Sequence, residues 1–211
     1  MNQRFPERNG ECEVRNLVVE RLAEAVRMLE GCPQFSRLMP EVRVNMVYAL
    51  PDAQSPADVA GVEGRITVVG GLPKASGPVR FGASDHMARL IIELRRHELD
   101  IRAGINFRWT EQILAFVQNW CKERDWFLGV IDRSLEPGEL VGKDRGSMAW
   151  KVEQLVRESG CRVPRVFYES RGWGKEPLFF MVGADPVPLA EDVIDISQRW
   201  DAECSGRSVE R

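Results

Sequence analysis

The chain has 211 residues, of which 44% are hydrophobic and 29% charged, an ordinary composition for a globular protein that is long enough for one well-packed domain. Its net charge of −3 lacks the basic excess of general nucleic-acid and membrane-surface binders, so we expect neither kind of partner. The five cysteines form no CxxC pair, and no segment resembles a secretory signal or a membrane span, so a reducing cytoplasm is the expected location.

The amino-terminal segment is predicted to be helical. Residues 1–12 are expected to form a disordered lead-in and residues 13–39 a helical arm, because apolar residues recur at helical spacing over 13–31 before a glycine. One such helix is too short for a helix-turn-helix unit, so no DNA-binding module is expected in front of the rest. Its apolar face is expected to dock on the protein or to mediate a homodimer.

After residue 40 the pattern changes to alternation. Val42, Val44, Met46, Tyr48 and Leu50 fall on one face, which predicts a strand over residues 42–50. The next elements are predicted in turn as a Pro/Gly-punctuated loop, a strand at 65–71, a turn-rich connection at 72–84 and a helix at 85–100.

Strands and helices then alternate to the end of the chain. The predicted strands cover 103–109, 126–132, 165–170 and 177–183, and the predicted helices cover 110–124, 147–160 and 187–200. Such alternation favours parallel strands with crossover helices. We therefore predict a layered α/β domain over residues 40–200, with a largely parallel or mixed central sheet, an N-terminal helix and a flexible tail at 201–211.

Polar residues gather where three of these strands end. They are Asn106, Arg108, Asp132, Arg171 and Lys175. Because ligands of open α/β sheets bind at the carboxyl ends of the strands, we expect these side chains to meet in one crevice. Its mostly cationic character suits phosphate, with Asp132 available as a ligand for a divalent metal. The alternatives are solvated surface for the cations and a cap or turn role for Asp132.

The stretch "FGASDHMARL" (81–90) places His86 at the start of a predicted helix. Backbone amides and the helix field favour an anion there, which would make His86 part of a second anion site. The alternative is that Ser84 or Asp85 caps the helix and His86 is incidental. His97 lies on a charged helix face and is expected at the surface. The tryptophans Trp109, Trp150 and Trp173 are expected either to stack on a flat heterocycle or to pack in the core.

Five ordered blocks of the chain resemble one family. They are "PEVRVNMVYALPDAQSPADVAGVEGRI" (40–66), "GPVRFGASDHMAR" (77–89), "INFRW" (105–109), "DRGSMAW" (144–150) and "RGWGKEP" (171–177). Together they are similar to the thiamine-phosphate synthase domain of the ThiN type, over about residues 15–200. In this family the domain forms the carboxy-terminal half of bifunctional pyrimidine kinases or occurs alone, and the present chain resembles the stand-alone form.

The resemblance implies a transferase. Members join hydroxymethylpyrimidine diphosphate to hydroxyethylthiazole phosphate, giving thiamine monophosphate and diphosphate. It further implies that Arg65 and His86 are the essential catalytic pair. The substrate- and phosphate-binding residues that we expect are Lys74, Ser84, Asn106, Arg108, Ser147, Arg171, Gly172, Trp173, Gly174 and Lys175.

Within this set we expect a division of work. Arg65 and Lys74, with Mg²⁺, would hold the diphosphate that His86 hydrogen-bonds or protonates. Arg108, Arg171 and Lys175 would hold the thiazole phosphate, and Asp132 would bind the metal or orient the pyrimidine. The alternative function is a non-catalytic domain that senses thiamine phosphates in a regulator of thiamine genes.

Overall fold

The computed structural model describes residues 7–140, 144–172 and 174–209. Its main feature is a seven-stranded sheet in the order β5-β2-β1-β6-β9-β8-β7, with a separate hairpin of β3 and β4. The strands are β1 (Met46–Ala49), β2 (Val59–Val62), β3 (Ile66–Val69), β4 (Leu72–Ala75), β5 (Val79–Phe81), β6 (Ala103–Arg108), β7 (Leu128–Ile131), β8 (Val166–Glu169) and β9 (Leu178–Gly183).

The strands pair mostly antiparallel. Among the described pairs only β7 and β8 run parallel, so the mixed sheet that we predicted as one form is confirmed and the largely parallel form is not. Strand β9 lies between β6 and β8 and is antiparallel to both. Strands β6, β7 and β8 therefore still point the same way, and their carboxyl ends reach the same edge of the sheet.

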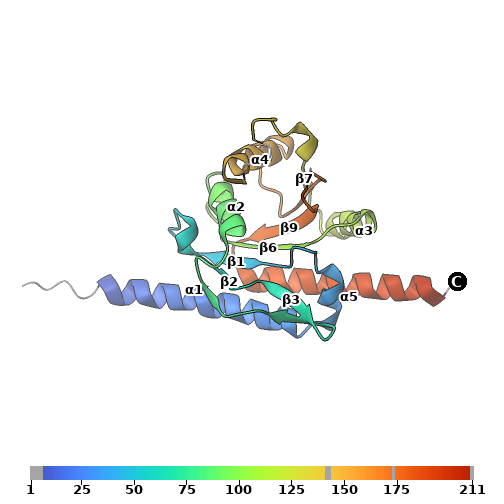
Figure 1. Ribbon diagram of the computed structural model, residues 1–211, viewed down its shortest axis with the longest axis horizontal. Helices are drawn as coiled ribbons and strands as arrows, with labels where there is room; N and C mark the ends of the chain where they lie inside the picture. The colour runs from blue at the N-terminus through green and yellow to red at the C-terminus, as the bar shows by residue number, and fades with distance from the viewer. Residues whose placement is uncertain (1–6, 141–143, 173, 210–211) are drawn as a thin grey trace, which may run out of the picture.

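Helices cover both faces of the sheet (Figure 1). Helices α2 (Asp85–Arg95) and α4 (Asp144–Glu158) lie over one face, α1 (Glu7–Glu30) and α5 (Pro186–Val209) lie under the other, and α3 (Glu111–Lys122) sits beside them and packs on α5. Three short 3-10 helices, η1 (Pro33–Leu38), η2 (Pro56–Asp58) and η3 (Arg133–Leu135), turn the chain between elements.

Helices α1 and α5 are longer than the sequence pattern predicts. Residues 7–12 are helical instead of a disordered lead-in, and residues 201–209 continue α5 instead of forming a flexible tail. The two helices run in the same direction with an offset (Figure 1), and the Arg21–Asp185 ion pair joins α1 to the residue just before α5. Once α1 and α5 are nucleated by packing, adding turns at their ends costs little, so helix continues where polar sequence alone did not predict it.

Helix α1 belongs to the main core. Its buried residues Leu22, Ala25 and Leu29 join one hydrophobic cluster with the sheet and with α5, so the predicted helical arm is not a separate unit. Strand alternation directs the side chains of β6 to opposite faces. Phe107 lies in the core, while Gly104 faces α2, where a Cβ would meet the Ile91 side chain at 2.9 Å.

Three short strands lie in segments that we predicted as loops. Strands β2, β4 and β5 have four residues or fewer, and they contain or adjoin Gly61, Pro73 and Gly82, which mask the alternation. Cross-strand pairing, not local pattern, stabilises them. Strand β1 is also shorter than predicted, because residues 42–45 precede it and Val44 forms only an isolated bridge with Ile66.

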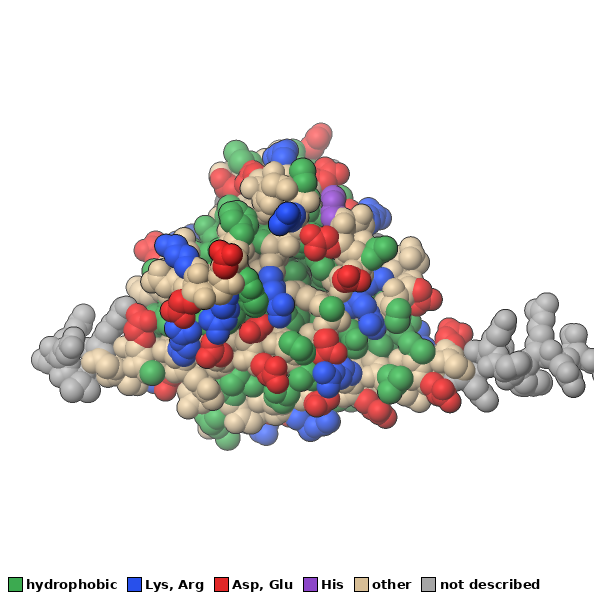
Figure 2. Space-filling model, turned by 180° about the vertical axis from the view of Figure 1, so that it is seen from behind, with side chains coloured by type: hydrophobic (Ala, Val, Ile, Leu, Met, Phe, Trp, Pro, Cys, Tyr) green, Lys and Arg blue, Asp and Glu red, His purple; other side chains and the backbone are tan. Residues whose placement is uncertain are grey.

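The surface carries both signs of charge. Figure 2 shows acidic and basic side chains intermixed over one whole face, in keeping with the small net charge. None of the described helices is long and apolar enough to cross a membrane.

The packing of α4 on the sheet can be tested by substitution of Gly129 in β7. A Cβ at this position would lie 2.8 Å from Leu155 Cδ1 and 3.1 Å from Phe167 Cβ, and closer still to Pro164. We expect Gly129→Ala to lower the free energy of unfolding by about 1–3 kcal/mol through overpacking, measured by urea denaturation. Gly138→Ala is the control, because no described heavy atom lies within 4 Å of its Cβ, and equal losses in both variants would contradict this packing.

Candidate active site

A cavity of about 460 Å³ lies between α2, α4 and the sheet, at the edge where β6 and β8 end. Its walls come from the start of α2, the turn between β2 and β3, the turn before β9 and the α2/α4 face of the sheet. We call it the α2/α4 pocket. Asn106, Glu169 and Phe180 reach it from three neighbouring strands because each lies on the same face of the sheet.

His86 enters this pocket from the first turn of α2. Ser84 is the buried N-cap residue of the helix but makes no capping hydrogen bond through its side chain. A Cβ on Gly61 of β2 would stand 3.2 Å from Ser84 Cβ, so glycine at 61 lets the start of α2 approach the sheet. The Asp85 carboxylate pairs with Arg89 one turn along the helix.

Arg65 lies in the turn between β2 and β3, and it also lines the α2/α4 pocket. Its backbone is left-handed, with φ of 71°, directly after Gly64 with φ of 69°. The guanidinium Nη1 donates to the carbonyl oxygen of Val42. A left-handed conformation costs a non-glycine residue about 1 kcal/mol or more, so an arginine here points to a functional role for the side chain.

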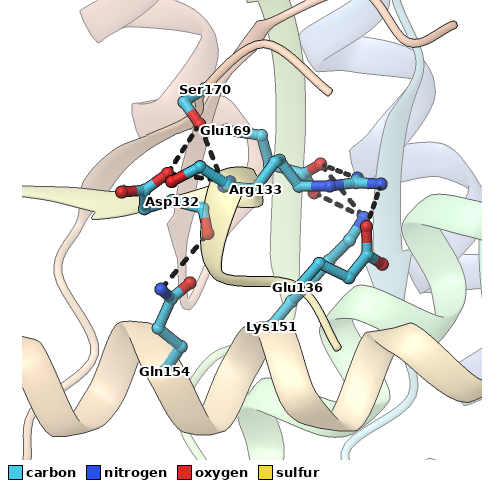
Figure 3. Close-up of polar contacts among 8 residues, drawn as sticks. Asp132, Arg133, Glu136, Lys151, Gln154, Glu169 and Ser170 are labelled. Carbon is cyan, nitrogen blue, oxygen red and sulfur yellow. Dashed lines mark hydrogen bonds and ion pairs between the residues drawn. The ribbon is translucent and has the colours of Figure 1, made fainter. Parts of the chain in front are cut away.

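A buried ionic network forms the floor of the pocket (Figure 3). Lys151 Nζ donates to Glu169 Oε1 and Oε2 at 2.9 and 3.0 Å, and Arg133 Nη1 donates to Glu169 Oε2 at 2.8 Å. Arg133 Nη2 donates to Glu136 at 2.9 Å. The side chains of Lys151, Arg133, Glu136 and Glu169 are 1, 3, 4 and 10% exposed.

The network keeps its carboxylate charged. Burial acts to raise the pKa of Glu169, but Lys151 and Arg133 outweigh it and His86 adds in the same sense, so the pKa of Glu169 lies below its ordinary value. Burial lowers the pKa of Lys151, and Glu169 opposes that effect. We therefore assign Lys151 as protonated and Glu169 as ionised at neutral pH, because each partner favours the charged form of the other.

The residues of this network do not stand out in the sequence. Lys151 stands in a predicted helix and Glu169 at the end of a predicted strand, and each alone is typical of a solvated surface. The available signal was the end of the strand: Glu169 is a carboxylate at the carboxyl end of β8, where the rule that selected Asp132 for β7 applies equally.

Two predicted binding residues, Asn106 and Ser147, are buried in this part of the structure. Asn106 is buried, accepts from the Asn45 amide at 2.8 Å and donates to the Arg43 carbonyl at 3.1 Å, so it holds the segment before β1 against β6. Ser147 is buried in α4, and its Oγ has no hydrogen-bond partner among the described residues.

A second cavity, of about 590 Å³, adjoins the first across Glu176, which lines both. We call it the α3 pocket, because it opens at the start of α3, where Thr110 Oγ1 caps the helix by accepting from the Ile113 amide at 3.1 Å. Arg108 and Arg171 line it. The Glu176 carboxylate accepts from the amides of residues 41 and 42, both at 3.0 Å, and so fixes the wall between the pockets.

The structure thus places the residues of the predicted crevice in two pockets instead of one. Lys175 lies in the α2/α4 pocket with Arg65 and His86, not with Arg108 and Arg171. Gly174, at φ of 65°, belongs to the same turn, and Gly172 packs against the Arg133 side chain. Trp173 lies outside the described residues. Trp109 lines the α3 pocket and stacks on Tyr168, and Trp150 packs against the core.

Two further candidates lie elsewhere. Lys74 is exposed on β4, outside the described lining of either pocket. The Asp132 carboxylate caps η3 by accepting from the Ser134 amide at 2.9 Å, and it faces Ser170, away from the buried network (Figure 3). These hydrogen bonds lower its pKa. The cap role that we left open for Asp132 is therefore what the structure shows.

Comparison with known proteins gives consistent matches. The family described as "Thiamine-phosphate synthase ThiN" matches residues 21–195. The chain is 36% identical to a thiamine-phosphate synthase ThiN of Methanothermobacter thermautotrophicus, over 86% of this chain and 93% of that protein. It is 28% identical to the bifunctional thiamine biosynthesis protein ThiDN of Methanocaldococcus jannaschii, over 83% of this chain and 39% of that protein. The crystal structure of the C-terminal domain of a phosphomethylpyrimidine kinase superposes with a TM-score of 0.80, at 36% identity, covering 85% of this chain and 98% of that domain.

The buried network makes a prediction about stability. Lys151→Ala or Glu169→Ala would leave a buried charge without its partner, so we expect each to lower the free energy of unfolding by about 3–5 kcal/mol. The double variant Lys151→Met/Glu169→Leu removes both charges and keeps most of the volume, so it should cost less than either single variant. Urea denaturation followed by circular dichroism measures all three, and additive losses would contradict a coupled pair.

Proposed function

The chain belongs to the ThiN family of thiamine-phosphate synthases, and we propose that its α2/α4 pocket is the place of the synthase reaction. A thiamine-phosphate synthase is a transferase. The observation that supports this site most directly is that Arg65 from the turn between β2 and β3 and His86 from the first turn of α2 line one cavity together with Lys175. Small-molecule substrates suit a cavity of this size.

The chemistry explains why cations are needed. The bond between the pyrimidine methylene carbon and the diphosphate oxygen breaks, and its electron pair leaves with the diphosphate. The thiazole nitrogen supplies the electron pair for the new carbon–nitrogen bond, so no nucleophile from the protein is required. Arg65, Lys175, His86 and the amides at the start of α2 would stabilise the charge that develops on the leaving diphosphate.

The α3 pocket would hold the second substrate. Arg108 and Arg171 form its cationic part, and charge-assisted hydrogen bonds to a phosphate are worth about 1.5–3 kcal/mol each. Because the two pockets adjoin at Glu176, a thiazole phosphate anchored at these arginines would extend its ring toward the α2/α4 pocket. This placement assigns Lys175 to the diphosphate, where we had first expected Lys74.

Mg²⁺ has no ready-made protein site in this part of the molecule. Among the described residues no three His, Cys, Asp or Glu side chains gather to hold a metal, and Glu169 already accepts three hydrogen bonds. The donor set therefore does not fit a resident Mg²⁺ at Asp132, and we assign no step to one. If Mg²⁺ takes part, the diphosphate oxygens are its natural ligands.

We also propose a cytoplasmic homodimer. A biosynthetic enzyme that uses phosphorylated intermediates suits the cytoplasm, and free cysteines among the described residues suit a reducing compartment. On α1, Leu17 is 63% and Val14 38% exposed, which supports association through this helix.

The catalytic pair is tested by two-precursor assays. Purified protein is expected to form thiamine monophosphate from hydroxymethylpyrimidine diphosphate and hydroxyethylthiazole phosphate, with and without Mg²⁺ as separate arms. In single-turnover measurements, Arg65→Ala, Arg65→Gly and His86→Ala should each slow product formation by about 10²–10³-fold. Binding of thiamine phosphate without any synthesis would favour the sensor function instead, and near-normal rates in all three variants would contradict the assigned roles.

The same Arg65 variants separate function from backbone strain. Both lose the guanidinium, but only glycine relieves the left-handed backbone, so Arg65→Gly should be more stable than Arg65→Ala by about 1 kcal/mol. Chemical denaturation of the two proteins measures the difference. Equal stabilities would show that the turn relaxes in solution.

The α3 pocket is tested by steady-state kinetics. Arg108→Ala and Arg171→Ala should raise KM for the thiazole phosphate about 10- to 100-fold, because each removes a charge-assisted contact, while KM for the pyrimidine diphosphate stays nearly unchanged. Arg157→Ala is the matched control, since that arginine is 72% exposed on α4. A rise in KM for the pyrimidine substrate alone would show that the two substrates occupy the opposite pockets.

A further inference from the structure

The α2/α4 pocket has a rim and a floor of different electrostatic character. Arg65, Lys175 and His86 are the less buried cationic or ionisable residues of the lining and form its rim, where the Glu176 carboxylate is already bound to two backbone amides. At the floor, Lys151 and Arg133 are matched by Glu169 and Glu136, so the network has no net charge. The rim therefore favours an anion and the floor does not.

An anion at the floor would meet an ionised carboxylate. Glu169 is held in its charged form by two cations, so a phosphate beside it would be repelled and would also lose its hydration. A neutral group with hydrogen-bonding atoms can instead use the polar atoms that the network presents. A substrate with a charged tail and a neutral ring would thus bind with the ring inward.

Among the described residues, Lys151 keeps one N–H and Glu169 one acceptor site without a partner. A carboxylate offers about four lone-pair sites, and Glu169 uses three of them on Lys151 and Arg133. Among the described residues, the Lys151 ammonium donates only to the two oxygens of Glu169, which leaves its third N–H for another acceptor. A ligand edge with one N–H beside one acceptor nitrogen would donate to Glu169 and accept from Lys151, so both groups would have all their hydrogen bonds.

Stability alone does not account for this pair. Replacing a buried ion pair by apolar side chains of similar volume is often neutral or stabilising, so burying Lys151 and Glu169 at the base of a cavity brings the fold no clear gain. The neighbouring wall is apolar and flat, with Phe180, Leu178 and Met87 lining the same cavity. An aromatic ring suits such a wall, with its polar edge toward the ion pair.

We propose that Lys151 and Glu169 form the subsite for the aminopyrimidine ring of the first substrate. Glu169 accepts from the exocyclic amine, Lys151 donates to the adjacent ring nitrogen, and the diphosphate extends toward Arg65, Lys175 and His86 at the rim. The proposal rests on the proposed function for the identity of the substrate. Arg133 acts as a positioning residue, since it holds Glu169 rather than touches the ring.

The test is a change of ligand preference, which a merely structural role would not produce. Isothermal titration calorimetry compares hydroxymethylpyrimidine diphosphate, its analogue with an oxo group in place of the exocyclic amine, and inorganic diphosphate. Wild-type protein should prefer the amino compound over the oxo compound by about tenfold or more, because the oxo compound in its lactam form turns an oxygen toward Glu169 and a ring N–H toward Lys151, so both hydrogen bonds are lost. In Glu169→Gln the amide can donate to the oxo oxygen, so this preference should fall several-fold, while inorganic diphosphate binds as in the wild type.

Glu136→Gln is the matched control. It makes the same change of carboxylate to amide in the same network, but Glu136 is not among the described residues that line the pocket, so the amino preference should persist. An unchanged preference in Glu169→Gln, or an equal loss in Glu136→Gln, would overturn the proposal. If Glu169→Gln does not fold, Lys151→Met/Glu169→Leu replaces it, with the same expectation that the amino preference disappears and inorganic diphosphate still binds.

The outcome is separable from that of the proposed function. Amino preference carried by Glu169 in a protein that forms no thiamine monophosphate would support the subsite and refute the synthase reaction. Synthesis by a Glu169→Gln variant that still prefers the amino compound would support the reaction and refute the subsite.

Discussion

A carboxylate in the interior of a protein stays ionised only where cations replace the water that it has lost, and Glu169 obtains them from two separate parts of the chain. Lys151 comes from α4 and Arg133 from the turn after β7, while Glu169 itself ends β8. If one of these charged groups were absent, the others would be buried without a compensating charge. The α2/α4 pocket therefore exists in its charged form only when α4, β7 and β8 are packed together.

Periodicity predicted the elements that are long or strongly amphipathic. The helices near 85–100, 110–124 and 147–160 and the strand near 103–109 all occur, with ends shifted by a few residues. In or next to the missed strands β2, β4 and β5, Gly61, Pro73 and Gly82 mask the alternation, and pairing with neighbouring strands defines these strands. Strand order and direction also depend on long-range pairing, so the antiparallel insertion of β9 between β6 and β8 could not be read from the alternation of strands and helices.

Part of the candidate site was predictable from the sequence, through the strand-end rule and through the family resemblance. The strand-end rule led to the edge of the sheet where the α2/α4 pocket lies because β6, β7 and β8 point the same way, even though the parallel arrangement that motivated it holds for one pair among the described strands. Local pattern alone did not decide between a catalytic and an incidental His86, and the block-by-block resemblance singled out Arg65. The buried network stayed hidden because 18 residues separate Lys151 from Glu169 and 36 separate Arg133 from it, and contacts over such distances leave no local signature.

The two ends of the α2/α4 pocket are built from different kinds of structure. Floor charges stand on β8, α4 and η3, which the core holds in place, whereas the rim cations Arg65 and Lys175 stand on connecting segments, the turn between β2 and β3 and the turn before β9. Connecting segments accept substitution and insertion far more readily than packed elements do. With the proposed roles of rim and floor, substitutions in the connecting segments would alter how fast the anion departs without altering which heterocycle is admitted, so that rate and selectivity would be separately adjustable traits in this fold.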